Sequence, residues 1–86
     1  MKSQLTDSFR KRYKRLPPAV QKQARAAYRL WKENPYYPGL HFKCIDPVES
    51  IYSVRIGLHY RAVGTRIGDT IIWYFIGTHE EYNHLL

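Results

Sequence analysis

The sequence predicts an α+β fold: two N-terminal helices packed on a four-stranded antiparallel sheet, with a short helix at the C-terminus. Two observations predict it. Apolar residues recur at helical spacing up to about residue 34. From residue 40 onward the apolar period changes to two, which is typical of half-buried strands. Because helices and then strands follow one another along only 86 residues, we expect one α+β domain over residues 1–86 with a shallow surface site.

Two helices are predicted before the sheet. Residues 1–16 carry an apolar stripe made by Leu5, Phe9, Tyr13 and Leu16. Ser3 or Thr6 would be the N-cap of this helix, and Pro17-Pro18 would end it. The second helix begins at Pro18 and ends before Asn34-Pro35. Its apolar stripe is made by Val20, Ala24, Ala27 and Trp31.

Four strands are predicted at residues 40–44, 51–56, 60–65 and 71–76. The turns that join them are expected at Asp46-Pro47, Gly57–His59 and Arg66–Asp69. The last strand consists of six consecutive apolar residues, which indicates a central strand covered on both faces.

The junction after this strand carries candidate catalytic side chains. Thr78 and Glu81 have the spacing of a capping box, so His79 would be the first residue of the C-terminal helix. Tyr82 follows three residues later on the same helical face. An imidazole and a phenol would therefore project together from a rigid corner, which suits a general acid or base.

Two arginines are expected to face each other in the sheet. If Gly57–His59 forms a three-residue loop, Arg55 lies opposite Arg61 on the same face. Like charges opposed in this way repel unless an anion binds between them, so the pair would clamp a phosphate. Lys43 lies on the polar side of the preceding strand and either converges on this site or faces solvent. The alternative for the arginines is an ordinary surface ion pair with Asp46, Glu49 or Asp69.

The formal charge of +7 comes from the N-terminal part of the chain. Residues 1–34 hold ten Lys and Arg against two acids, whereas residues 35–86 hold four against five. A basic helical surface suits phosphate backbones or an acidic protein partner, or it is simply a solvated face. The single cysteine, Cys44, forms neither an intramolecular disulfide nor half of a zinc site. Without a membrane-length apolar run or a signal peptide at Met1–Gln4, we expect a cytoplasmic protein with no membrane contact, metal or cofactor.

Taken together, these residues resemble the RelE/ParE superfamily, the toxins of bacterial type II toxin-antitoxin systems. The resemblance is carried by the order of elements, the hairpin Tyr52–Val63 with its two arginines, and the ending Ile76–Tyr82. It implies a toxin that is neutralised by a cognate antitoxin. Ribosome-dependent members cleave mRNA in the ribosomal A site and so inhibit translation, whereas ParE-type members poison DNA gyrase.

The resemblance also implies roles for individual residues of a metal-independent endoribonuclease, or mRNA interferase. The catalytic set would be His79, Arg61, Arg55 and Tyr82. The RNA-binding set, which contacts mRNA among the phosphates of the ribosomal RNA, would be Lys43, His59 and Arg66. In this mechanism a base takes the proton of a 2′-hydroxyl, the oxygen attacks the adjacent phosphate, and an acid protonates the departing 5′-oxygen.

Two features depart from the superfamily pattern. Residues 1–16 are predicted to be helical where the superfamily often opens with a strand, and Glu80-Glu81 adds negative charge beside His79. A gyrase poison and an inactive module that only binds an antitoxin therefore stand as alternatives to the nuclease.

Overall fold

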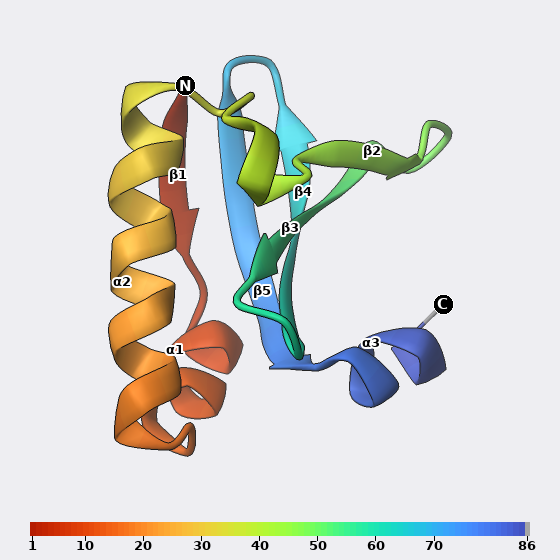
Figure 1. Cartoon of the computed structure of the whole chain (residues 1–86). Helices are drawn as coiled ribbons and strands as arrows, with labels where there is room; N and C mark the ends of the chain where they lie inside the picture. The colour runs from red at the N-terminus through yellow and green to blue at the C-terminus, as the bar shows by residue number, and fades with distance from the viewer. Residues whose placement is uncertain (86) are drawn as a thin grey trace.

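A twisted five-stranded sheet lies between helices on its two sides (Figure 1). The computed structural model describes residues 1–85. In chain order the elements are β1 (Lys2–Leu5), α1 (Asp7–Lys14), α2 (Pro18–Glu33), a 3₁₀ turn (Pro38–Leu40), β2 (Lys43–Asp46), β3 (Ile51–Ile56), β4 (Tyr60–Ile67), β5 (Thr70–Thr78) and α3 (His79–Leu85). The strand order is β1-β5-β4-β3-β2. β1 is parallel to β5, and the other neighbouring strands are antiparallel.

The sheet corrects the prediction of four antiparallel strands after an N-terminal helix. Residues 2–5 form β1, which pairs with the first half of β5, rather than the start of a helix. The amide of Lys2 donates to the Asp69 carbonyl at 2.8 Å, and that of Thr6 donates to the Trp73 carbonyl at 3.0 Å. This segment has little strand propensity of its own. It is extended because the backbone groups of a central apolar strand need partners along both edges.

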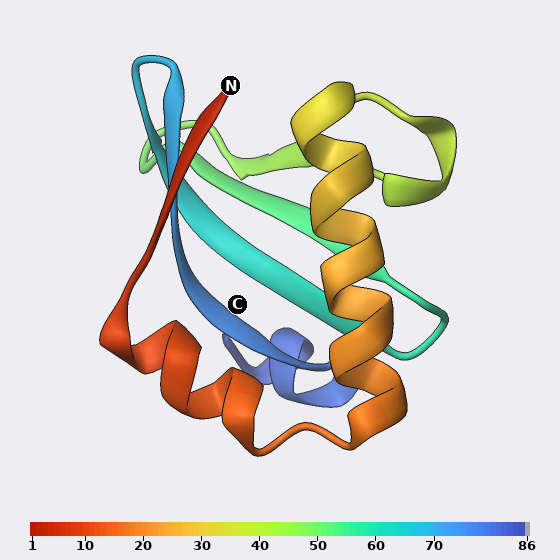
Figure 2. The ribbon, with the colours of Figure 1, turned by 90° about the vertical axis from the view of Figure 1, so that its left-hand side faces the viewer.

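Helix α1, and not β1, covers the edge of β5 along the second half of the strand. α1 begins at Thr6, whose hydroxyl accepts the Phe9 amide at 3.1 Å, so of the two predicted N-caps Thr6 is confirmed. α1 packs along β5 beyond the end of β1 (Figures 1 and 2). A short strand and a short helix together therefore protect the exposed edge of β5.

Hydrophobic clusters lie on both faces of the sheet. The larger one packs between α2 and the sheet, and it contains Trp31, Ile56, Ala62, Trp73 and Ile76. The smaller one lies on the other face, where α3 closes over it; its buried members are Val63, Phe75 and Tyr82. α2 and α3 are accordingly seen on opposite sides of the sheet (Figure 1). A side chain's place along a strand thus decides which helix it meets.

The connection between α2 and β3 also differs from the prediction. Strand β2 starts at Lys43, and the residues before it form the 3₁₀ turn and a left-handed residue, His41, with φ 48°. Leu40 and Phe42 are buried, but they reach the core from a loop and not from the predicted strand. Alternation over residues 40–44 reflects this packing and not an extended backbone. β4 and β5 are longer than predicted, which reduces their connection to Gly68-Asp69.

Candidate functional site

Two arginines face each other on one side of the sheet, as the predicted three-residue loop required. Arg55 of β3 pairs in register with Arg61 of β4, and Arg61 pairs with Gly77 of β5. Cross-strand partners share a face, so both guanidinium groups start from the same side. It is the side opposite α2, because the neighbouring residues Val54 and Ala62 belong to the larger core cluster.

Neither arginine has a carboxylate partner among residues 1–85. The ion pairs within this range are Arg10 with Asp7 and Arg12 with Glu81. The surface ion pair that the sequence also allowed for Arg55 or Arg61 is therefore absent from the described residues. Arg55 instead donates from Nε to the Gly57 carbonyl at 2.9 Å. Arg61 has a buried nitrogen, Nη1, without a hydrogen-bond partner in the described chain. Within the described residues, two opposed cations without an acidic partner thus point to an anion as the missing partner.

Arg61 connects this pair to the start of α3. Its Nε donates to Nδ1 of His79 at 3.4 Å, and its Cζ lies 5.4 Å from the centre of the Tyr82 ring. The His79 and Tyr82 rings are 5.8 Å apart. Tyr82 is buried against Val63 and Phe75, so it anchors α3 to the sheet while one side of its ring faces the arginine and the histidine. The three predicted side chains are therefore brought together.

The capping box that positions His79 is formed as predicted. A carboxylate oxygen of Glu81 accepts the Thr78 amide at 2.8 Å, and the Thr78 hydroxyl accepts the Glu81 amide at 3.1 Å. The pKa of Glu81 lies below its ordinary value. The hydrogen bond from the Thr78 amide is the main cause, and the Thr78 hydroxyl and Arg12 contribute less. The ionised carboxylate of Glu81 thus holds the start of α3.

Arg12 is a member of this corner that the sequence did not reveal. Its Nη1 lies 3.7 Å from Glu81, and its Cζ lies 4.6 Å from the centre of the Phe75 ring. In the sequence it belongs to an unbroken basic stretch, Arg10–Arg12, and no local pattern distinguishes it from its neighbours. Only the packing of α1 along the edge of β5 brings it to the opposite end of the chain.

The predicted RNA-binding residues do not lie together. Lys43 is exposed and pairs with Ser53, which is two positions before Arg55 on the same face, so its ammonium group is on the arginine side. Arg66 lies on the other face: its Nη1 donates to the Tyr52 hydroxyl at 3.3 Å, and its Cζ lies 5.5 Å from the Tyr52 ring. Its contacts give it a structural role on that face.

His59 contributes to the site through its backbone. It is exposed in the loop between β3 and β4, and its carbonyl accepts the His79 amide at 2.8 Å. The hairpin that carries the two arginines is therefore tied directly to the first residue of α3. This bond keeps the distance between the cations and the imidazole fixed.

The arrangement suits proton transfer at a bound anion. Arg55 and Arg61 would hold the anion, and the imidazole of His79 lies next to Arg61. Among residues 1–85 there is no group of three or more His, Cys, Asp and Glu side chains placed to hold a metal ion. No helix in this range is long and apolar enough to cross a membrane.

Solved structures of similar fold were found by comparison. A chain of the RelB–RelE antitoxin–toxin complex from Methanococcus jannaschii has a TM-score of 0.75 at 20% identity, with 96% of this chain and 98% of that chain covered. The toxin-antitoxin complex RelBE2 from Mycobacterium tuberculosis gives 0.68 at 17% identity, covering 91% and 96%. The isolated RelE toxin of E. coli gives 0.67 at 16% identity, covering 99% and 98%. At these identities the likeness concerns the fold.

A comparison with curated protein sequences found no match. A protein-family model described as the ParE-like toxin domain matches residues 18–84, which include α2, the antiparallel part of the sheet and nearly all of α3. The chain therefore has the fold of the RelE toxins and belongs to the family of ParE-like toxin domains.

Proposed function

We propose that the chain is a toxin that cleaves mRNA on the ribosome, stops translation and is neutralised by an antitoxin. The observation that carries this proposal is the pair Arg55 and Arg61, held face to face without a carboxylate partner among residues 1–85 and joined through Arg61 to His79. The antitoxin partner is supported by the similar structures from Methanococcus jannaschii and Mycobacterium tuberculosis, which are antitoxin–toxin complexes.

The arginines would hold the scissile phosphate. A phosphate between Arg55 and Arg61 removes the repulsion of the two guanidinium groups. In the reaction, the 2′-oxygen forms a bond to phosphorus, and the bond from phosphorus to the 5′-oxygen breaks. Negative charge grows on the phosphate oxygens in the transition state, so cations at this position lower the barrier.

His79 would supply the proton to the leaving group. The general acid would be the imidazolium form of His79, in which both ring nitrogens carry protons. After Nε2 has passed its proton to the departing 5′-oxygen, the neutral ring is left, and its Nδ1 then accepts from Nε of Arg61. The 2′-hydroxyl proton passes to a base, and the products are a 2′,3′-cyclic phosphate and a free 5′-hydroxyl. Tyr82 keeps the imidazole in place by anchoring α3.

Expression in a bacterial host tests the proposal. The unaltered chain should arrest growth, and mapped mRNA ends should carry 2′,3′-cyclic phosphates at cuts made on ribosomes. His79→Ala should relieve the arrest, because general acid catalysis contributes about 10²–10⁴-fold to rates. His84→Ala is the matched control, since it changes a second exposed histidine of α3. Arrest that persists in His79→Ala, or equal relief in the control, would remove His79 from the mechanism.

A second candidate is a poison of DNA gyrase. The family description favours it, because it names ParE-like toxins. ParE-type members are the ones for which the sequence resemblance implied a gyrase poison. The same expression experiment separates the two functions. Intact mRNA together with accumulated cleaved DNA would indicate the gyrase poison. Normal growth and intact nucleic acids, with an antitoxin still bound, would indicate a module that has lost its activity.

A further inference from the structure

Helix α1 is fixed to the rest of the chain at both of its ends. At its start, the amide and the hydroxyl of Thr6 donate to the Trp73 carbonyl of β5 at 3.0 and 3.1 Å. At its end, Gln21 of α2 donates to the Tyr13 carbonyl at 3.0 Å. Arg25 of α2 donates to the Tyr13 hydroxyl at 2.7 Å. Together these bonds set both the position of α1 and its rotation about its own axis.

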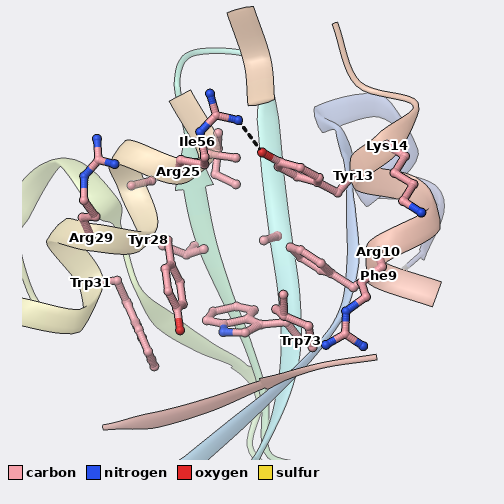
Figure 3. Close-up of a pocket in the computed structure, with 15 residues that line it drawn as sticks. Phe9, Arg10, Tyr13, Lys14, Arg25, Tyr28, Arg29, Trp31, Ile56 and Trp73 are labelled. Atoms are coloured by element: carbon pink, nitrogen blue, oxygen red, sulfur yellow. Dashed lines mark hydrogen bonds between the residues drawn. The ribbon is translucent and has the colours of Figure 1, made fainter. Parts of the chain in front are cut away.

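The rotation of α1 decides where its charged side chains lie. Figure 3 shows Phe9 and Tyr13 pointing from α1 into an apolar groove between α1 and α2. Successive residues of a helix are about 100° apart, so Arg12 lies to one side of this apolar stripe. It lines a separate cavity of about 250 Å³ at the end of β5, together with Gly77 and Glu81.

Arg12 contacts two residues at the junction of β5 and α3. Its Cζ lies 4.6 Å from the centre of the buried Phe75 ring, and its Nη1 lies 3.7 Å from Oε2 of Glu81. The other oxygen of this carboxylate, Oε1, accepts the Thr78 amide at 2.8 Å. A single carboxylate therefore joins α1 to the first turn of α3.

The connection continues from Glu81 to the proposed acid, His79. The Glu81 carboxylate and the Thr78 hydroxyl fix the backbone on both sides of His79. The His79 amide donates to the His59 carbonyl at 2.8 Å. With its backbone held in this way, the imidazole moves only by its own side-chain torsions. Its place beside Arg61 therefore depends on the position of Glu81.

The Glu81 side chain has room to leave this position. It is 54% exposed and borders the cavity at the end of β5. Among residues 1–85, Arg12 is the cation that forms an ion pair with it. An exposed ion pair changes a local equilibrium by about two- to fivefold, which matters little for the whole fold. The cleavage rate, however, is proportional to the fraction of molecules in which the imidazole is correctly placed.

We propose that Arg12 is a positioning residue, which acts through Glu81 to hold the start of α3 so that His79 stays beside Arg61. The proposal rests on the proposed nuclease and gives α1 a part in its activity without contact to RNA. Position 12 requires only a cation within reach of one carboxylate oxygen, so lysine should serve there. This requirement differs from that at position 61, where the planar guanidinium group is needed.

Cleavage by variants at position 12 tests the role. Arg12→Gln should lower the single-turnover cleavage rate at saturating ribosomes about two- to fivefold. The ribosome concentration that gives half of this rate should not change, and Arg12→Lys should keep the original rate. Arg15→Gln is the matched control, because Arg15 lines the same cavity and has no ion pair with an acid among residues 1–85. Weaker ribosome binding at an unchanged maximal rate would make Arg12 an RNA contact and overturn the proposal.

A double-mutant cycle tests whether Arg12 acts through Glu81. Glu81→Gln removes the charge but keeps an oxygen that accepts the Thr78 amide. In this background Arg12→Gln should have no further effect on the cleavage rate. The same reduction in both backgrounds would show that Arg12 acts through another contact, and the proposal would be wrong.

Amide hydrogen exchange measures the connection without RNA. Arg12→Gln should speed exchange of the Thr78 amide about two- to fivefold. The amide of Val63, in the buried part of β4, should exchange as in the unaltered chain. An unchanged Thr78 amide, or equal acceleration at Val63, would contradict a local hold on α3. If the unaltered chain leaves mRNA intact, the proposed nuclease fails, and this measurement still decides whether Arg12 holds the start of α3.

Discussion

Arg61 is the residue on which the site depends most. It faces a second arginine, donates to His79 and keeps a buried nitrogen free. A lysine at this position would retain the positive charge but would lose the planar fork that makes these contacts simultaneously. The geometry of the guanidinium group, more than its charge, therefore sets its role.

Arg61→Lys should reduce mRNA cleavage in spite of the conserved charge. A hydrogen bond to a charged group contributes about 1.5–3 kcal/mol, so we expect the single-turnover cleavage rate to fall about tenfold or more. Arg66→Lys serves as the control, because Arg66 lies on the other face against Tyr52. If the two variants cleave equally well, the role assigned to the guanidinium geometry of Arg61 is incorrect.

Glu81 should make the start of α3 sensitive to acid. Its pKa is lowered in the folded state, mainly by the Thr78 amide. A lowered carboxyl pKa stabilises the fold fully above the ordinary value of 4.5, and this stabilisation is lost as the pH falls through the lower folded-state pKa. The amide exchange of Thr78 should therefore increase in that acidic window. In Glu81→Gln this pH dependence should disappear, and its persistence would assign it to another group.

At the level of elements, α3 stays on the sheet because the penultimate residue of β5, Gly77, is a glycine. A β-carbon added at Gly77 would lie 2.8 Å from a carboxylate oxygen of Glu81 and 2.9 Å from the edge of the Phe75 ring. The capping carboxylate passes over the strand at this point. The close approach, and not an unusual backbone angle, makes glycine necessary.

Gly77→Ala should loosen α3 and lower the free energy of unfolding. Overpacking of a closed site costs about 1–3 kcal/mol, and here the shift would fall on the capping box. Gly39→Ala is the control, since nothing lies within 4 Å of a β-carbon at that position. Chemical denaturation measures both variants. An unfolding free energy of Gly77→Ala that matches the Gly39→Ala value would contradict the close contact.

Elements that depend on local signals were predicted well from the sequence. The loop length of residues 57–59 set the register of Arg55 against Arg61, and the capping box set the start of α3. β1 was missed because its pairing with β5 spans almost the whole chain, and Leu5 continues the apolar spacing of the following helix. Arg12 was missed for the same reason. Both positions are decided by the long-range packing of β5, which no local pattern encodes.

At the scale of the whole molecule, positively charged side chains lie on both faces of the sheet, and the two faces differ in chemistry. On the face of α3, Lys43, Arg55 and Arg61 lie on the same side of the sheet, and Arg61 contacts the imidazole of His79. On the face of α2, cations flank an apolar groove. The sheet separates them, so a nucleic acid and a protein partner need not compete for the same cations. Substitution of any one of these cations should therefore weaken the binding of only one of the two ligands.

The salt dependence of RNA binding should show how many cations of the arginine face neutralise phosphates. For single strands the slope of log affinity against log salt is about −0.7 for each neutralised phosphate, so three cations predict a slope of about −2. A short oligonucleotide that lacks the 2′-hydroxyl binds without being cleaved. Arg55→Gln should make its slope shallower by about 0.7. Arg25→Gln lies on the groove face and should leave it unchanged. An equal change in both variants would mean that the nucleic acid is held by the overall charge of the chain, and that the two faces do not divide their ligands.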